Sequence, residues 1–337
     1  MPLIHELLES ERITQKPRSN FELIDSVLSG KFSGRIADFI ENFYCTCPQS
    51  IEYHSSDLAE SVIGTKRTAL SGLDSLLDRV CREVEENKMK CYIAETREEA
   101  GKIVREIVGS GKKVFKSFSL ALEECGIGEV LSGEGNDVYD TELPVLLKEI
   151  SGGQQDLSSY RDKIEKADFG VTDAAALSTE PGALFLLPRS GLERLASMAP
   201  PRHIALVGLD QIVPSYEDGF KVVELAMKLD RKLNYASVVG GPSKTGDIEK
   251  KIVYGAHGPK EVHLIILDDG RRNSAKKSPF REALSLPMLG KVPCKQLWPF
   301  WKEILGLDGA RELSDLLIRE RQTSYLGRDL AQLLNLL

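Results

Sequence analysis

Long apolar runs and a cationic leader are both missing from this sequence. No apolar stretch approaches the roughly 20 residues that a bilayer-spanning helix needs. The first residues, MPLIHELLESER, include acidic side chains where a signal peptide has a basic segment and then an apolar one. We therefore expect a cytoplasmic protein without a membrane span.

An excess of basic residues is missing as well. The 44 Lys and Arg residues are outnumbered by 51 Asp and Glu residues, which leaves a net charge of −7. Proteins that bind nucleic acid cluster Lys and Arg against the phosphates, so nucleic acid is not an expected partner. The 42% apolar and 28% charged residues are typical of a globular protein, and no internal repeat suggests a solenoid.

Cysteine is sparse and scattered. The six cysteines are Cys45, Cys47, Cys81, Cys91, Cys125 and Cys294, and no C-x-x-C pair occurs. The spacing of Cys45 and Cys47 is too tight for a usual zinc or cluster pair. We expect reduced thiols and no metal site.

Helical and strand patterns alternate along the middle of the chain. A helical apolar stripe begins at Leu70, and Thr96 with Glu99 forms a capping box for a later helix. Strands are predicted at 91–94, 112–116, 169–172, 183–187, 203–207, 251–254 and 261–267. Further helices are predicted before Gly126 and at 143–150, 157–167, 189–197 and 216–233. This alternation indicates an α/β fold with a Rossmann-like, mostly parallel sheet.

The first candidate binding segment is the turn Lys116-Ser117-Phe118-Ser119, between a predicted strand and a helix. Hydroxyls, free helix amides and a Lys ammonium at such a turn can hold a phosphate or a carboxylate. The alternative is that the serines only cap the helix and that Lys116 points into solvent.

The second candidate is Glu180, which stands between Thr179 and a Pro-Gly pair, at a strand edge near Thr172. If it is buried, Glu180 can act as an acid, a base or a ligand gate. Otherwise it fixes the turn by accepting hydrogen bonds from backbone amides.

Two histidines are weaker candidates. His203 starts a predicted strand after Pro200-Pro201, and His257 lies in a Gly-rich turn. Either could serve as a base or bind a carboxylate, although a lone histidine is more often structural.

The last candidate is the loop Gly240 to Glu249, GGPSKTGDIE. Its glycines, including Gly241, allow close backbone approach, Ser243, Lys244 and Thr245 offer donors for an anion, and Asp247 could orient Lys244. The spacing of a P-loop is not met. A polar hairpin explains the same residues equally well.

Taken in order, these segments resemble the LUD-domain (lactate-utilisation) family. The resemblance runs from about Leu70 to Arg272. It rests on ALSGLD, KSFS, GVTDAAALSTEPG, RLASMAPPRHIALVGLDQIVPSYEDG, GGPSKTGDIE, GAHGPKEVH and LDDGR. It implies a sheet like that of ribose-phosphate isomerases and CoA transferases, and a role in oxidising lactate within a multi-component complex.

The sequence departs from the LutB-type members of that family after Arg281-Glu282-Ala283-Leu284. Those members carry the ferredoxin pattern C-x-x-C-x-x-C-x-x-x-C-P there, since four thiolates hold each cubane. Here Leu286, Leu289 and Val292 stand at the cysteine positions, and Cys294 is the one thiol of that region. We therefore expect no iron–sulfur cluster and a docking role for the tail.

These observations predict three segments: a helical extension over 1–60, the α/β domain over 61–272 and a helical tail over 273–337. We expect a subunit of lactate or 2-hydroxy-acid utilisation, with partner subunits of an oxidoreductase complex. It would bind a small carboxylate or phosphate between Lys116, Glu180 and the GGPSKTGDIE loop. A free-standing isomerase- or CoA-transferase-like enzyme with Glu180 as base or nucleophile, and a non-catalytic scaffold or sensor, are the alternatives.

Overall fold

The computed structural model describes residues 57–117, 119, 121–122, 125–141, 163–188, 191–229, 233–246, 252–276, 281 and 284. Residues 1–56 of the extension predicted over 1–60, the helix at 143–150, most of the helix at 157–167 and nearly all of the tail lie outside these residues. Within them, no helix has both the length and the apolarity needed to cross a bilayer.

A six-stranded sheet forms the centre of the described fold, and every neighbouring pair of its strands is parallel. Its strand order is β1-β12-β7-β4-β2-β3. The strands are β1 (Lys90–Ala94), β2 (Lys113–Lys116), β3 (Asp137–Asp140), β4 (Phe169–Asp173), β7 (Arg202–Gly208) and β12 (Glu261–Leu267). The predicted α/β class and parallel sheet are confirmed.

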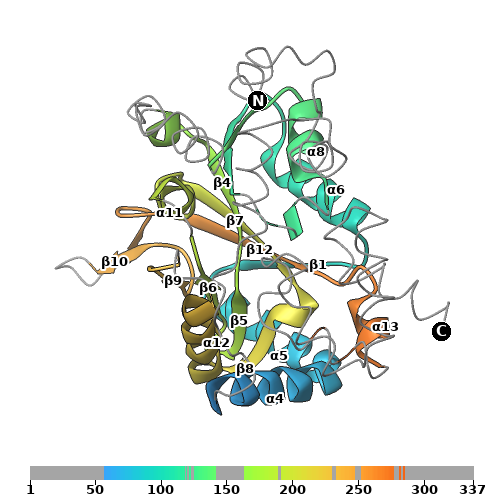
Figure 1. Ribbon diagram of the computed structural model, residues 1–337. Helices are drawn as coiled ribbons and strands as arrows, with labels where there is room; N and C mark the ends of the chain where they lie inside the picture. Colours follow the sequence, from blue (N-terminus) through green and yellow to red (C-terminus); the bar gives the residue numbers. More distant parts are fainter. Residues whose placement is uncertain are drawn as a thin grey trace, which may run out of the picture.

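Helices cover one face of this sheet (Figure 1). They are α6 (Arg97–Val108) and α8 (Ile127–Gly133), which bury the apolar side chains of alternate strand positions such as Val171, Ile204 and Ile265. Thr96 caps α6 as predicted, since its hydroxyl accepts from the amide of Glu99 at 3.2 Å. The apolar alternation of the buried strands therefore specifies which side faces these helices.

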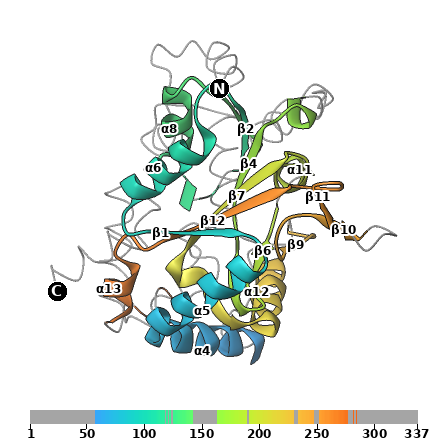
Figure 2. The ribbon, with the colours of Figure 1, turned by 180° about the vertical axis from the view of Figure 1, so that it is seen from behind.

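The other face packs on a second layer that the sequence did not predict (Figure 2). This layer holds a four-stranded sheet of order β8-β5-β6-β9. Its strands are β5 (Ala176–Glu180), β6 (Ala183–Leu186), β8 (Ile212–Ser215) and β9 (Ser237–Val239), and its helices are α4 (Asp57–Ser71), α5 (Leu73–Glu86) and α12 (Tyr216–Leu229). Of these strands, only β6 was predicted.

The remaining described elements lie around the sheets. They are α11 (Gly191–Met198), the 3₁₀ turn η2 (Leu209–Gln211), the hairpin of β10 (Lys244–Gly246) and β11 (Ile252–Tyr254), and α13 (Arg271–Ala275). The hairpin precedes β12 and α13 follows it, so the two lie at opposite ends of that strand (Figure 1). The helix predicted from Leu70 onward is split at Gly72 into α4 and α5.

Candidate functional site

The strand order contains one point at which the chain reverses its direction across the parallel sheet. From β2 the chain passes outward to β3, whereas from β4 it passes the other way to β7. The carboxyl ends of β2 and β4 therefore flank a topological switch point. Ligands of open α/β sheets bind in the crevice outside the carboxyl ends of the strands at such a point.

Lys116 ends β2 at this switch point, and its side chain is only 5% exposed. Its ammonium lies 3.2 Å from a carboxylate oxygen of Asp140, the last residue of β3, and donates to the carbonyl of Ser117 at 3.2 Å. The side chain also packs against α8, since its Cε lies 3.5 Å from the position of a Cβ on Gly128. The alternative in which Lys116 points into solvent is therefore wrong.

Two buried hydroxyls belong to the residues that directly follow Lys116 and Asp140 in the chain. Ser117 and Thr141 are each 0% exposed, and neither hydroxyl has a hydrogen-bond partner among the described residues. Their backbones are fixed, because the amide of Ser117 donates to the carbonyl of Val171 and that of Thr141 to the carbonyl of Lys116. A buried hydroxyl without a partner is costly, which makes these two atoms candidate ligand contacts.

A second carboxylate lies on the same side of the sheet. Val171 is the register partner of Lys116, and Asp173 stands two residues further along β4, so both share the face of Lys116. Asp173 is 4% exposed. One face of the switch point therefore carries an ammonium and two carboxylates, and the next residues of the chain at the ends of β2 and β3 carry two hydroxyls. Groups of these kinds suit a small ligand with one anionic group and one hydroxyl.

Ser119 has a structural role beside this group. Its hydroxyl accepts from the amide of Leu122 at 3.2 Å, as expected of a helix cap. The capping alternative therefore holds for Ser119, whereas for Ser117 no such bond is formed.

Thr172 and His203 contact one another but lie away from Lys116. The hydroxyl oxygen of Thr172 is 2.8 Å from Nε2 of His203, and both residues are buried. Burial, and next the neighbouring His263, lowers the pKa of His203 to about 4. The strand alternation places this pair on the opposite face from Lys116, which indicates a structural contact in the core.

Glu180 is not buried. Its side chain is 59% exposed and forms an ion pair with Arg79 of α5. Glu180 ends β5 in the second sheet, whereas Thr172 belongs to the six-stranded sheet. The acid–base role expected from the sequence required a buried Glu180, and the exposure of its side chain removes that premise.

The GGPSKTGDIE loop lies at the amino ends of the parallel strands, whereas Lys116 lies at the carboxyl end of β2. The amide of Ser243 donates to the carbonyl of Pro259, just before β12 begins, and Lys244 and Thr245 are exposed on β10. Gly241 sits against α5, because a Cβ there would lie 2.4 Å from the carbonyl oxygen of Asn87.

This loop therefore lies near the Glu180 turn, since the side-chain amide of Asn87 also donates to the carbonyl of Pro181. His257 is an exposed residue of the same amino-terminal edge, and Asp247 lies outside the described residues. The expected single site between Lys116, Glu180 and the loop is thus divided between two edges of the sheet.

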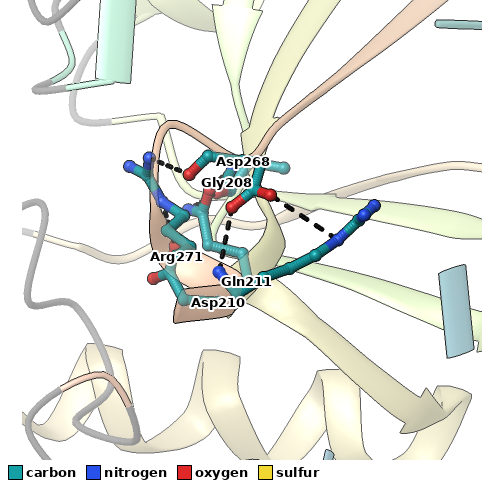
Figure 3. Close-up of polar contacts among 7 residues, drawn as sticks. Gly208, Asp210, Gln211, Asp268 and Arg271 are labelled. Atoms are coloured by element: carbon teal, nitrogen blue, oxygen red, sulfur yellow. Dashed lines mark hydrogen bonds and ion pairs between the residues drawn. The ribbon is translucent and has the colours of Figure 1, made fainter. Parts of the chain in front are cut away.

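The carboxyl ends of β7 and β12 carry polar residues that satisfy one another (Figure 3). Nε of Arg271 donates to Asp210 at 2.7 Å, and Nη1 donates to the carbonyl of Asp268 at 3.1 Å. Gln211 accepts from the amide of Gly208 at 2.6 Å. Because these groups are paired, we assign them a structural role: they clamp the end of β7 to the end of β12. The candidate ligand contacts are instead the hydroxyls of Ser117 and Thr141 at the switch point, which are unpaired among the described residues.

Sequence reasoning missed Asp140, Thr141 and Asp173 as candidates. Asp140 ends a strand of four residues and Thr141 follows it, inside a stretch rich in Gly, Asp and Glu whose composition indicates a surface excursion. Asp173 was visible directly after a predicted strand, and its place at a carboxyl end was the available signal.

These features define a doubly wound α/β protein with a polar group at its switch point. The chain belongs to the LUD domain family, whose family model matches residues 77–267. Among curated relatives, lactate utilization protein B of Shouchella clausii is 29% identical over 259 residues, which cover 64% of this chain and 52% of that protein. The same-named protein of Bacillus subtilis is 25% identical over 251 residues, 62% of this chain and 51% of the relative.

A third relative is the uncharacterized electron transport protein YkgF of Escherichia coli, 25% identical over 282 residues, 70% of this chain and 56% of that protein. The chain thus spans about half the length of these relatives. A solved structure of a DUF162 family protein from Deinococcus radiodurans, 19% identical, covers 58% of this chain and 98% of its own, with a TM-score of 0.40.

The thiols of the described residues do not fit an iron–sulfur cluster. Cys81, Cys91 and Cys125 are the cysteines there, and no three His, Cys, Asp or Glu side chains of that part converge as metal ligands would. A cubane needs four cluster ligands. The tail positions with Leu286, Leu289 and Val292 lie outside the described residues.

Proposed function

We propose that this chain is a ligand-binding component of lactate or related 2-hydroxy-acid utilisation, and that its ligand occupies the switch point at the carboxyl ends of β2, β3 and β4. The observation that carries the proposal is that the buried hydroxyls of Ser117 and Thr141 have no partner among the described residues, at the strand ends where Lys116 and Asp140 form a buried ion pair. The names of the relatives, lactate utilization protein B, supply the substrate class.

A 2-hydroxy carboxylate matches the chemistry of these groups. Its carboxylate would accept from the Lys116 ammonium and the two hydroxyls, because charge-assisted hydrogen bonds are the strong ones. Its 2-hydroxyl would donate to Asp140 or Asp173. The two carboxylates repel a second negative charge on the ligand. Lactate has one charge and a neutral hydroxyl that can donate, so it is expected to bind better than phosphate.

The proposed role is binding within a larger oxidoreductase assembly. The described residues around Lys116 include no histidine at the switch point and no grouped metal ligands. In this role, partner subunits that carry electrons would supply the lactate-oxidising step. The tail after Leu284 is the segment we assign to docking, as the sequence predicts.

Thermal melting with a ligand panel tests this proposal. A ligand that binds only the folded state stabilises it by about 2.7 kcal/mol at 100-fold its Kd. We expect lactate to raise the Tm more than pyruvate, propionate or inorganic phosphate, and Ser117→Ala with Thr141→Ala to remove the rise. Ser132→Ala, on the exposed side of α8, is the matched control. If none of the four compounds raises the Tm, the scaffold alternative gains and the proposal is lost.

A further inference from the structure

Two cysteines from different elements lie in contact between α5 and β1. Sγ of Cys81, on α5, is 3.0 Å from Sγ of Cys91, on β1, although ten positions separate them in the sequence. Both side chains are partly exposed, whereas Cys125 is buried in another cluster. The two sulfur atoms are only about 1 Å further apart than in a disulfide bond of about 2.05 Å.

The two thiols differ in character. The hydrogen bond between them lowers the pKa of Cys81 and raises that of Cys91, and burial of Cys91 acts in the same direction. Cys81 is therefore the better nucleophile and Cys91 the proton donor that stabilises its thiolate. A thiolate with a second thiol beside it is the arrangement in which an oxidised sulfur can be resolved rapidly.

We infer that Cys81 and Cys91 form a redox-active dithiol that reacts with hydroperoxides and closes to an intramolecular disulfide. The Cys81 thiolate attacks the peroxide, breaks its O–O bond and becomes a sulfenic acid, while the alcohol or water leaves. The Cys91 sulfur then attacks the Cys81 sulfur, forms the S–S bond and releases water. In sum, two thiols and one hydroperoxide give one disulfide, one alcohol or water, and one further water.

This disulfide would join α5 to β1. The same helix carries Arg79 and ends at its cap Asn87, and both residues contact the Glu180 turn. Oxidation would therefore fix the amino-terminal edge of the sheet to its covering layer. The switch point lies at the other edge. The inference therefore stands independently of the proposed ligand.

Peptide mapping of the full chain after hydrogen peroxide treatment tests the inference. Tryptic cleavage separates residues 80–82 from 91–97, so the disulfide would produce a linked pair of these peptides that disappears on reduction. We expect this pair in the wild type and in Cys125→Ser. Cys91→Ser should instead accumulate a sulfenic acid on Cys81 that a dimedone-type reagent traps. In Cys81→Ser, the reagent should trap little or no sulfenic acid on Cys91.

The wild-type mapping does not depend on whether either variant folds. Peroxide-treated wild type in which Cys81 and Cys91 stay reduced, or link only to other cysteines or to another chain, would overturn the inference. Equal trapping of sulfenic acid at Cys81 and Cys91 in the two single variants would overturn the assignment of Cys81 as the attacking thiol.

Discussion

Arg271 and Asp210 form a buried ion pair that ties the end of β12 to the end of β7. Nε of Arg271 lies 2.7 Å from a carboxylate oxygen of Asp210, and the two side chains are 1% and 6% exposed (Figure 3). Removing one partner of such a pair leaves an uncompensated buried charge. This pair keeps the carboxyl edge in place beside the candidate site.

Asp210→Ala should lower the free energy of unfolding by about 3–5 kcal/mol, the usual cost of breaking a buried pair. Urea denaturation measures the difference. Lys228→Ala is the comparison, because Lys228 and Glu224 form a pair with both side chains 56% exposed, and its loss should cost less than about 1 kcal/mol. Equal effects of the two substitutions would contradict the clamp.

Two glycines should respond in opposite directions to the same substitution. A Cβ on Gly170 would lie 1.7 Å from the carbonyl oxygen of Ala196 on α11, so Gly170→Ala must force β4 and α11 apart, at a cost of about 1–3 kcal/mol or more. Gly64 is inside α4 with nothing within 4 Å of the new methyl group, and Gly64→Ala should stabilise by about 0.5–1 kcal/mol. Urea titrations of both variants check the signs; stabilisation by Gly170→Ala would refute the packing of α11 on β4.

Stability should fall in mild acid because of His203. Burial lowers its pKa to about 4, whereas the unfolded chain takes up the proton near pH 6.5. Its contribution is therefore complete above pH 6.5 and is lost as the pH falls toward about 4, by about 3 kcal/mol. The measurement is the free energy of unfolding at several pH values. His203→Gln should flatten the curve in this window, and an unchanged slope in that variant would contradict the assignment.

Glu180→Gln should be nearly silent. The side chain is 59% exposed and its ion pair with Arg79 is a surface pair, so the loss of stability should stay below about 1 kcal/mol. Ligand-induced melting shifts should also be unchanged, since Glu180 lies away from Lys116. A variant that folds normally but no longer responds to any ligand would restore Glu180 as a functional carboxylate.

Sequence patterns predicted every strand of the central sheet except β3, because the others are short apolar runs between helices. The run at 261–267 and the run at 203–207 are buried on both faces and were recognised as strands. The strand over 212–215 was missed because it directly follows the 3₁₀ turn and contains a proline, which disfavours a strand prediction.

The site was predictable in part. Lys116 and Ser117 were candidates because a strand-to-helix turn can bring hydroxyls, helix amides and an ammonium together, and as ligand contacts they stay predictions. Their grouping with the GGPSKTGDIE loop was wrong, because the loop lies at the amino ends of the parallel strands and Lys116 at a carboxyl end. In addition, β12, which follows the loop in sequence, lies three strands away from β2 in the sheet. Pairing in a parallel sheet is non-local, so no local pattern contains it.

The most direct test of the switch-point site is a calorimetric titration of lactate into wild type, Lys116→Gln and Lys113→Gln. Lys113 begins the same strand and is exposed, so its substitution removes the same charge away from the site. We expect Lys116→Gln to weaken binding by about 10- to 100-fold, as the loss of a charge-assisted hydrogen bond predicts, and Lys113→Gln to bind as wild type does. Wild-type affinity in a folded Lys116→Gln variant would contradict the account.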